Sequence, residues 1–155
     1  TTTCRCSSRR SGVSPIGVAE AFEGAPLLVE RVGEGGDPAA VIARARAALA
    51  AMSESERIAV LGAHPRIGET TGLSPRSVAE QGADPTDVET LGTLRRLNAE
   101  YERTFGFRFV VFVRGRSRAQ IVPVLRARLA RSREQELATG IEELLAIARD
   151  RLARA

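Results

Sequence analysis

Helix-start signals recur along almost the whole chain, and they constrain the fold more than any other feature of the sequence. A capping residue precedes a proline at Ser14-Pro15, Asp37-Pro38 and Ser74-Pro75, which is the arrangement favoured in the first turn of a helix. A second signal is the capping box, in which Ser or Thr is followed three residues later by Glu or Gln. This spacing occurs at Ser53 to Glu56, Thr86 to Glu89, Ser117 to Gln120 and Ser132 to Gln135.

Apolar residues repeat at steps of three and four within the segments that these signals open. One such row runs from Val88 to Phe105 and another from Leu137 to Leu152, as in the buried stripe of an amphipathic helix. We therefore expect an all-α fold, a compact single-domain bundle of about seven or eight helices. The predicted helices lie near residues 15–23, 26–32, 38–52, 54–63, 75–82, 87–104, 118–131 and 133–153.

One segment departs from the helical pattern. Phe107 to Val113 reads FRFVVFV, which is apolar, aromatic and β-branched, and it lies between Gly106 and Gly115. Periodicity predicts a buried strand or a buried extended segment here. Because no second strand is predicted to pair with it, its backbone N–H and C=O groups need other partners, and a bound ligand is one candidate.

The 155 residues are enough for one domain with a sizeable core. Residues 1–13 have the composition of a flexible tail, so we expect the domain to span residues 14–155. No apolar run is long enough to span a membrane and no apolar leader opens the chain, so we expect no membrane partner and a cytoplasmic location. The two cysteines lie in the tail, and no disulfide framework is expected.

The basic and metal-binding residues exclude several chemistries. All 23 basic residues are arginine, so a Schiff-base lysine and a phosphate-loop lysine are absent. With one histidine and two cysteines, a metal site would need many carboxylates, and we expect no metal and no cofactor. The net charge of +4 suggests nucleic acid. However, aromatic residues are few, and the arginines at 126, 128, 131 and 133 alternate with apolar residues as on a solvated helix face, so no nucleic-acid partner is expected.

The only histidine, His64, is the first candidate for chemistry. Because Pro65 disfavours helical backbone at the residue before it, the helix of 54–63 should end at His64. The negative end of the helix dipole favours the charged imidazole there, which suits a general acid working near neutral pH. A capping or surface histidine is the alternative.

Three further features have both an ordinary and a functional interpretation. Ser77, Glu80 and Gln81 share one helix face at i, i+3 and i+4, which makes either a polar site or a plain solvated face. Arg151 in the last helix is either a solvated terminal arginine or a ligand for an anion. Phe109 to Val113 contribute to the core, and their backbone groups are candidates for binding a small polar ring.

These pieces together resemble one known family. Their order is His64-Pro65, then Ser77 with Glu80 and Gln81, Leu97-Asn98 with Tyr101, Phe105 to Phe109, and Arg151-Leu152. It resembles the 2-oxo-4-hydroxy-4-carboxy-5-ureidoimidazoline (OHCU) decarboxylases of urate degradation, from about Phe22 to Leu152. The resemblance implies an all-helical, cofactor-independent enzyme that converts this small ureidoimidazoline to (S)-allantoin. A homodimer is one option for its assembly.

The resemblance also implies roles for individual residues. It places the catalytic histidine at His64 and the functional arginine at Arg151, and we assign Glu80 as the carboxylate that orients His64. Substrate contacts are implied for Pro65, Ser77, Glu80, Gln81, Phe109, Val110, Val111, Phe112 and Val113. This chain departs from the usual pattern in that Arg108 replaces a proline between two phenylalanines, and Arg66-Ile67 replaces the Asp-Leu of many members.

Three alternatives remain open from the sequence. The same pocket could hold an anionic ligand without turnover, as a binding module. A related enzyme on this fold could act on a different acid. An arginine-rich protein that binds nucleic acid or acts as a scaffold would instead show binding that weakens steeply with salt.

Overall fold

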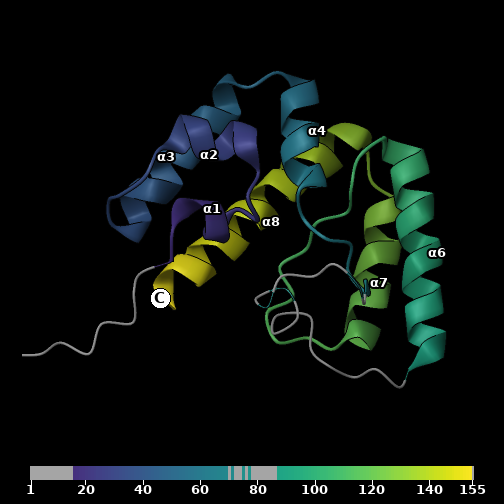
Figure 1. The fold of residues 1–155 in the computed structure, drawn as a ribbon. Coiled ribbons are helices and arrows are strands. Elements are labelled where there is room, and N and C mark those ends of the chain that lie inside the picture. The colour runs from purple at the N-terminus through teal and green to yellow at the C-terminus, as the bar shows by residue number, and fades with distance from the viewer. Residues whose placement is uncertain (1–15, 70, 72–74, 76, 78–86, 155) are drawn as a thin grey trace, which may run out of the picture.

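The structure is a computed structural model that describes residues 16–69, 71, 75, 77 and 87–154. Within these residues it contains seven helices and no strand, which confirms the all-α prediction (Figure 1). The helices are α1 (Val18–Ala21), α2 (Pro26–Val32), α3 (Pro38–Ala51), α4 (Glu54–Gly62), α6 (Val88–Phe105), α7 (Arg118–Leu129) and α8 (Arg133–Ala153). The expected tail of residues 1–13 and most of the expected helix at 75–82 lie outside the described residues.

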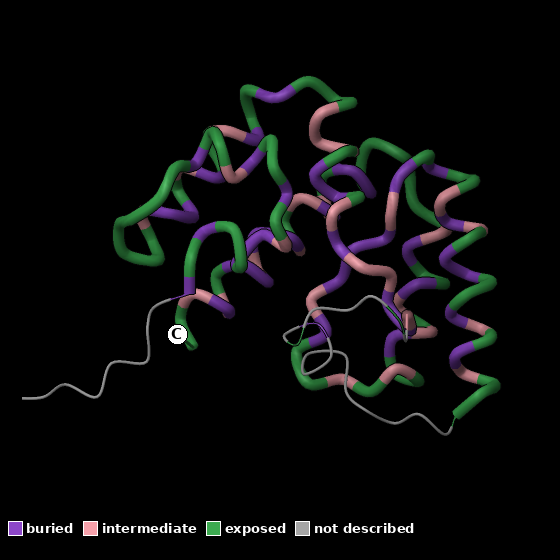
Figure 2. Tube along the Cα trace, viewed as in Figure 1, coloured by how far each residue is buried: buried purple, intermediate pink, exposed green. Residues whose placement is uncertain are grey.

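The long helix α8 is the centre of the fold. Helices α1, α3, α4 and α6 all contact it, while α2 packs on α3 and α7 packs on α6 (Figure 1). Figure 2 shows buried and exposed positions alternating along α6, as its apolar period predicts. No helix in the described part of the chain is long and apolar enough to cross a membrane.

The helix starts follow the capping signals closely. Capping boxes form at Ser53, Ser117 and Ser132, and Asp37 accepts a hydrogen bond from the N–H of Ala40 with Pro38 at the first helical position. The predicted capping box at Thr86 is wrong by one residue, because the carboxylate of Asp87 accepts the N–H of Thr90 at 2.9 Å. Val88 consequently lies in the exposed first turn of α6 and is not part of its buried stripe.

The segment between α6 and α7 is buried and non-helical, as predicted. Phe107, Phe109, Val110, Val111 and Val113 are all buried within it, and no strand pairs with it among the described residues. The ring of Tyr101 on α6 packs against this segment, with its centroid 5.2 Å from that of Phe109. We call residues 107–113 the pocket wall, because residues 109–113 line a pocket.

A buried ion pair joins the pocket wall to three helices. Glu136 on α8 is fully buried and accepts hydrogen bonds from the hydroxyl of Tyr101 on α6 at 2.5 Å and from Nε of Arg128 on α7 at 2.7 Å. Arg128 also donates to the carbonyl of Val110 at 2.7 Å and lies over the ring of Phe109. The expectation that Arg128 lies on a solvated face is therefore wrong, because a buried carboxylate compensates its charge.

Removing the charge of Glu136 should destabilise the fold strongly. Glu136→Gln leaves the Arg128 guanidinium buried without a counter-charge, which typically costs about 3–5 kcal/mol. The exposed pair of Arg46 and Glu142 provides a matched control, and Glu142→Gln should cost less than about 1 kcal/mol. Urea unfolding of both variants measures the difference, and equal losses would contradict the importance of the buried pair.

Candidate active site

A pocket of about 260 Å³ opens between the end of α4, the last turns of α8 and the pocket wall. The predicted site residues that line it are His64, Pro65, Ser77, the five residues 109–113 and Arg151. These come from four separate parts of the sequence, so the fold brings together what the resemblance grouped. Glu80 and Gln81 lie outside the described residues, and of their predicted polar face only Ser77 is placed.

The end of α4 places His64 in this pocket. The helix ends at Gly62, and the N–H groups of Ala63 and His64 close its last turn by bonding the carbonyls of Val60 and Leu61. This is the stop that Pro65 predicts. Only 4% of His64 is exposed, and its Nε2 atom has no hydrogen-bond partner within the described residues.

The far end of the His64 loop is held by α6. The side-chain amide of Asn98 donates to the carbonyl of Ile67 at 3.0 Å. Gly68 has a φ of 82°, and a Cβ atom added there would lie 3.2 Å from Cβ of Leu94, so both the backbone and the close packing require glycine.

The charge state of His64 differs from the expectation. The pKa of His64 is lowered to about 4 by burial, then by the positive charge of Arg151 and also by that of Arg108, while the negative charge of Glu23 acts in the opposite direction. Desolvation of the imidazole therefore outweighs the helix dipole. The expectation that the charged form is favoured is wrong, and the imidazole is neutral near pH 7.

Arg151 is buried rather than solvated. Only 2% of the residue is exposed, and its guanidinium donates to Oε1 of Glu23 at 2.7 Å. It also bonds the carbonyls of Glu20 and Ala21 at the end of α1. Arg151 is thus a fixed positive charge at the pocket.

The sequence interpretation missed Glu23, which bonds two residues that line the pocket. Its carboxylate also accepts the hydroxyl of Ser77 at 2.5 Å, so one carboxylate holds both Ser77 and Arg151. Burial alone would raise the pKa of Glu23, but the Ser77 hydroxyl and Arg151 bring it below the ordinary value. The backbone φ of Glu23 is 53°, a left-handed conformation that non-glycine residues adopt where surrounding contacts impose it.

The helix predicted to reach residue 23 in fact ends at Ala21. The left-handed conformations of Glu23 and Gly24 end it, since neither continues a right-handed helix. The one signal in the sequence was an acidic residue placed between Phe22 and Gly24.

The backbone of the pocket wall is only partly occupied by protein partners. The carbonyl of Val110 accepts from Arg128, the N–H of Phe112 donates to Glu143 at 2.5 Å, and the carbonyl of Phe112 accepts from Arg116. Among the described residues, no hydrogen-bond partner is found for the N–H groups of Val110, Val111 and Val113. These donors belong to residues that line the pocket, where a ligand could satisfy them.

Arginine predominates among the charged residues of the pocket. Arg114, Arg151 and Arg154 line it together with Asp150, and Asp150 pairs with Arg154 at 2.9 Å. No group of three or more His, Cys, Asp or Glu residues that could hold a metal ion is found in the described part of the chain. The fold and the pocket thus define a helical protein with a buried neutral histidine beside a fixed arginine, suited to acid–base chemistry on a small anion.

The comparison with known proteins identifies the family. The OHCU decarboxylase family model matches residues 18–153, and the chain belongs to this family, which confirms the resemblance found in its motifs. A 2-oxo-4-hydroxy-4-carboxy-5-ureidoimidazoline decarboxylase of Haloferax volcanii is 30% identical over 141 residues, which are 86% of this chain and 83% of that protein. The mouse protein of the same name is 32% identical over 109 residues, covering 66% and 61% of the two chains.

Two further matches extend this result. The uric acid degradation bifunctional protein PucL of Bacillus subtilis is 37% identical over 93 residues, which are 58% of this chain and 19% of that longer protein. The crystal structure of an OHCU decarboxylase in the presence of (S)-allantoin superposes with a TM-score of 0.69 at 22% identity, covering 88% of this chain and 94% of that one. This structural likeness supports the fold.

The buried histidine should make stability depend on pH in a definite direction. The pKa of His64 is lower in the folded protein, about 4, than the ordinary 6.5. Its contribution to stability is therefore present above pH 6.5 and is lost as the pH falls toward 4. Between pH 7 and pH 5 the wild type should lose about 2 kcal/mol more unfolding free energy than His64→Gln. Urea unfolding at the two pH values checks this, and an equal pH dependence of both proteins would contradict it.

Proposed function

We propose that this protein decarboxylates OHCU to (S)-allantoin in urate degradation, with His64 as the proton carrier and without a metal or organic cofactor. The observation that supports it is the convergence of His64, Pro65, Ser77, residues 109–113 and Arg151 on one pocket. Membership of the OHCU decarboxylase family indicates the substrate. A cytoplasmic location and a homodimeric assembly stay predictions.

The substrate itself supplies the electron sink. It is an anion with a carboxylate and a hydroxyl on one ring carbon, and when the bond to the carboxylate breaks, the ring C=N bond absorbs the electron pair. The ring nitrogen then takes a proton from solvent, and CO₂ leaves. The remaining enol becomes allantoin when the hydroxyl proton moves to the neighbouring ring carbon.

In this proposal His64 moves that last proton. Its neutral imidazole accepts the hydroxyl proton, and the resulting imidazolium returns it to one face of the carbon atom, which sets the configuration of the product. A neutral base is what burial and Arg151 favour at His64. Glu80 is assigned to orient the imidazole by a hydrogen bond, as carboxylates do for catalytic histidines.

The remaining residues bind and orient the substrate. Arg151 is assigned to an anionic group, since its planar guanidinium matches a carboxylate. Ser77, Gln81 and the backbone of Phe109 to Val113 are assigned to the ring and the ureido group. The N–H groups of Val110, Val111 and Val113 are suitable donors for carbonyl oxygens of the ligand.

Circular dichroism tests this function. The sample is freshly made urate-oxidase product, to which a hydrolase that converts it to the substrate has been added. The protein should cause rapid appearance of one allantoin enantiomer, whereas the spontaneous reaction proceeds slowly without this selectivity. His64→Gln should reduce the rate by about 10²–10⁴-fold, the usual contribution of a general acid–base group. Tight allantoin binding without turnover would favour the binding module, and unchanged rates in both His64→Gln and Glu80→Ala would contradict the assigned mechanism.

Glu23→Gln should weaken catalysis by loosening the two residues that the carboxylate holds. The amide keeps the size of the side chain but removes the negative charge from the group whose Oε1 atom accepts from both Ser77 and Arg151. Since hydrogen bonds to charged groups contribute about 1.5–3 kcal/mol, kcat/KM should fall by about tenfold or more. Glu30→Gln on the exposed face of α2 is the matched control. Equal kinetics of the two variants would show that Glu23 does not position the site.

A further inference from the structure

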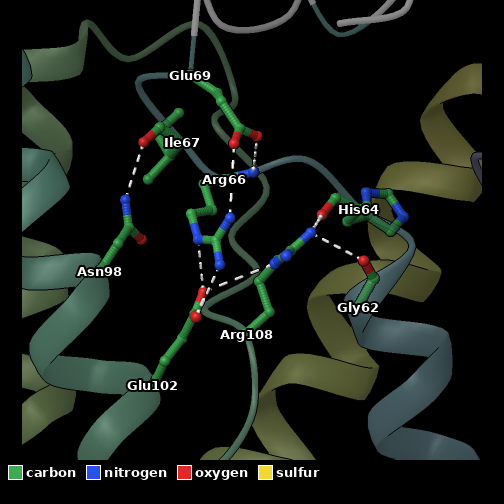
Figure 3. A network of polar contacts seen from close by, with 8 residues as sticks. All are labelled: Gly62, His64, Arg66, Ile67, Glu69, Asn98, Glu102 and Arg108. Carbon is green, nitrogen blue, oxygen red and sulfur yellow. Dashed lines mark hydrogen bonds and ion pairs between the residues drawn. The ribbon is translucent and has the colours of Figure 1, made fainter. Parts of the chain in front are cut away.

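Two of the positions at which this chain departs from the usual family pattern meet in one contact network. Arg66 follows the His64-Pro65 pair, and Arg108 stands between the two phenylalanines that begin the pocket wall. Figure 3 shows both side chains converging on Glu102, which projects from α6. We call Arg66, Glu102 and Arg108 the arginine clamp.

Arg108 contacts the backbone that carries the histidine. One terminal nitrogen of its guanidinium donates to the carbonyl of Gly62 at 2.8 Å and to the carbonyl of His64 at 2.6 Å (Figure 3). The last carbonyls of a helix have no partner within the helix, and a positive charge at this end is favourable. Arg108, which lies 44 residues after His64 in the sequence, therefore caps the end of α4.

The same contact joins two sides of the pocket. Arg108 belongs to the pocket wall, whose residues 109–113 line the cavity, and its guanidinium bonds the loop that presents His64 and Pro65 to that cavity. One side chain thus links the loop that carries the imidazole to the wall that carries the backbone donors.

Glu102 anchors the clamp. It accepts a bidentate pair of hydrogen bonds from Arg66, at 2.8 and 2.9 Å, the strongest geometry for such a pair. Its carboxylate also lies 3.7 Å from Nε of Arg108. Arg66 is further fixed by Glu69, whose carboxylate accepts the backbone N–H of Arg66 at 3.0 Å. One carboxylate on α6 therefore holds both arginines against the His64 loop.

We propose that Arg108 is a positioning residue for His64: by bonding the carbonyls of Gly62 and His64 it fixes the histidine against the pocket wall, with Glu102 and Arg66 holding it in place. The kinetic part of this inference rests on the proposed decarboxylation, while the contact itself does not.

The charge of Arg108 acts on the protonation of His64, which can be measured separately from activity. The charged groups that act on His64 are Arg151 from α8, Glu23 after α1 and Arg108 from the pocket wall. Burial is the largest cause of the low pKa of His64, and Arg108 adds to the lowering. A side chain that only supported the fold would not change the protonation of His64 when its charge alone is removed.

An NMR titration of the imidazole tests the contact without any substrate. Because His64 is the only histidine, its ring resonances give one titration curve for the whole protein. Arg108→Gln should move the midpoint to higher pH, and Arg108→Lys, which keeps the charge, should leave it near the wild-type value. Glu102→Gln should not raise it, since that change removes a negative charge. Arg96→Gln, an exposed arginine on α6 paired with Glu100, is the control and should leave the midpoint unchanged.

Steady-state kinetics test the positioning. Arg108→Gln and Glu102→Gln should each lower kcat by about tenfold, because small displacements of a catalytic group are costly, while KM changes less. Arg108→Lys should restore part of kcat, and Arg96→Gln should behave as wild type. Far-ultraviolet circular dichroism confirms that each variant is folded at the assay pH.

The outcomes separate this inference from the proposed function. If the wild type shows no decarboxylation, the proposed function fails, yet the shift of the imidazole midpoint in Arg108→Gln still supports or contradicts the contact. If the wild type is active and Arg108→Gln keeps both the kcat and the midpoint of the wild type, the positioning role is wrong. It is also wrong if kcat falls equally in Arg108→Gln and Arg108→Lys with no change in the midpoint.

Discussion

The carboxylate of Glu136 is the contact on which the helices and the pocket wall jointly depend. It lies on α8 and binds Tyr101 of α6 and Arg128 of α7 in a fully buried position. Burial and then the bond to Glu136 raise the pKa of Tyr101 above its ordinary value, so the phenol remains a donor. Arg128 also donates to the carbonyl of Val110. The packing of the helices and the position of the cavity lining therefore depend on the same buried ion pair.

The other contacts that shape the cavity follow the same principle. Glu23 joins the end of α1 to Arg151 on α8 and to Ser77, and Arg108 joins the pocket wall to the loop after α4. Each contact connects segments that are tens of residues or more apart in the sequence. The helices supply a rigid frame through apolar packing, while a small number of charged groups at low exposure determine how the irregular segments between them are placed. Function is concentrated in those segments, because their backbone groups are not all used by secondary structure.

The sequence predicted the parts of this structure that are local. Capping boxes at Ser53, Ser117 and Ser132 located helix starts within a residue, since the bonds that define them span three residues. The non-helical segment at 107–113 was recognised from its composition. The contacts between different helices and loops were not predicted: the sequence predicts Arg128 on a solvated face and Glu23 at the end of a helix. Neither residue has a local signature, because Glu136, which pairs with Arg128, lies on the next helix, and Ser77 and Arg151, which bond Glu23, lie 54 and 128 residues along the chain. The assigned roles of Glu80 and Gln81 stay predictions, since both lie outside the described residues.

The protonation of His64 depends on its burial, which the sequence alone does not give. The helix dipole acts on any histidine at that position, but desolvation acts only on a buried one, and here it is the larger effect. In the proposed reaction the imidazolium is favourable only while an enolate lies beside it. Transfer of the proton to carbon removes that negative charge, after which burial and Arg151 again favour the neutral imidazole. The environment that makes the His64 imidazole a weak base therefore makes its imidazolium a strong acid in the step that sets the configuration of the product.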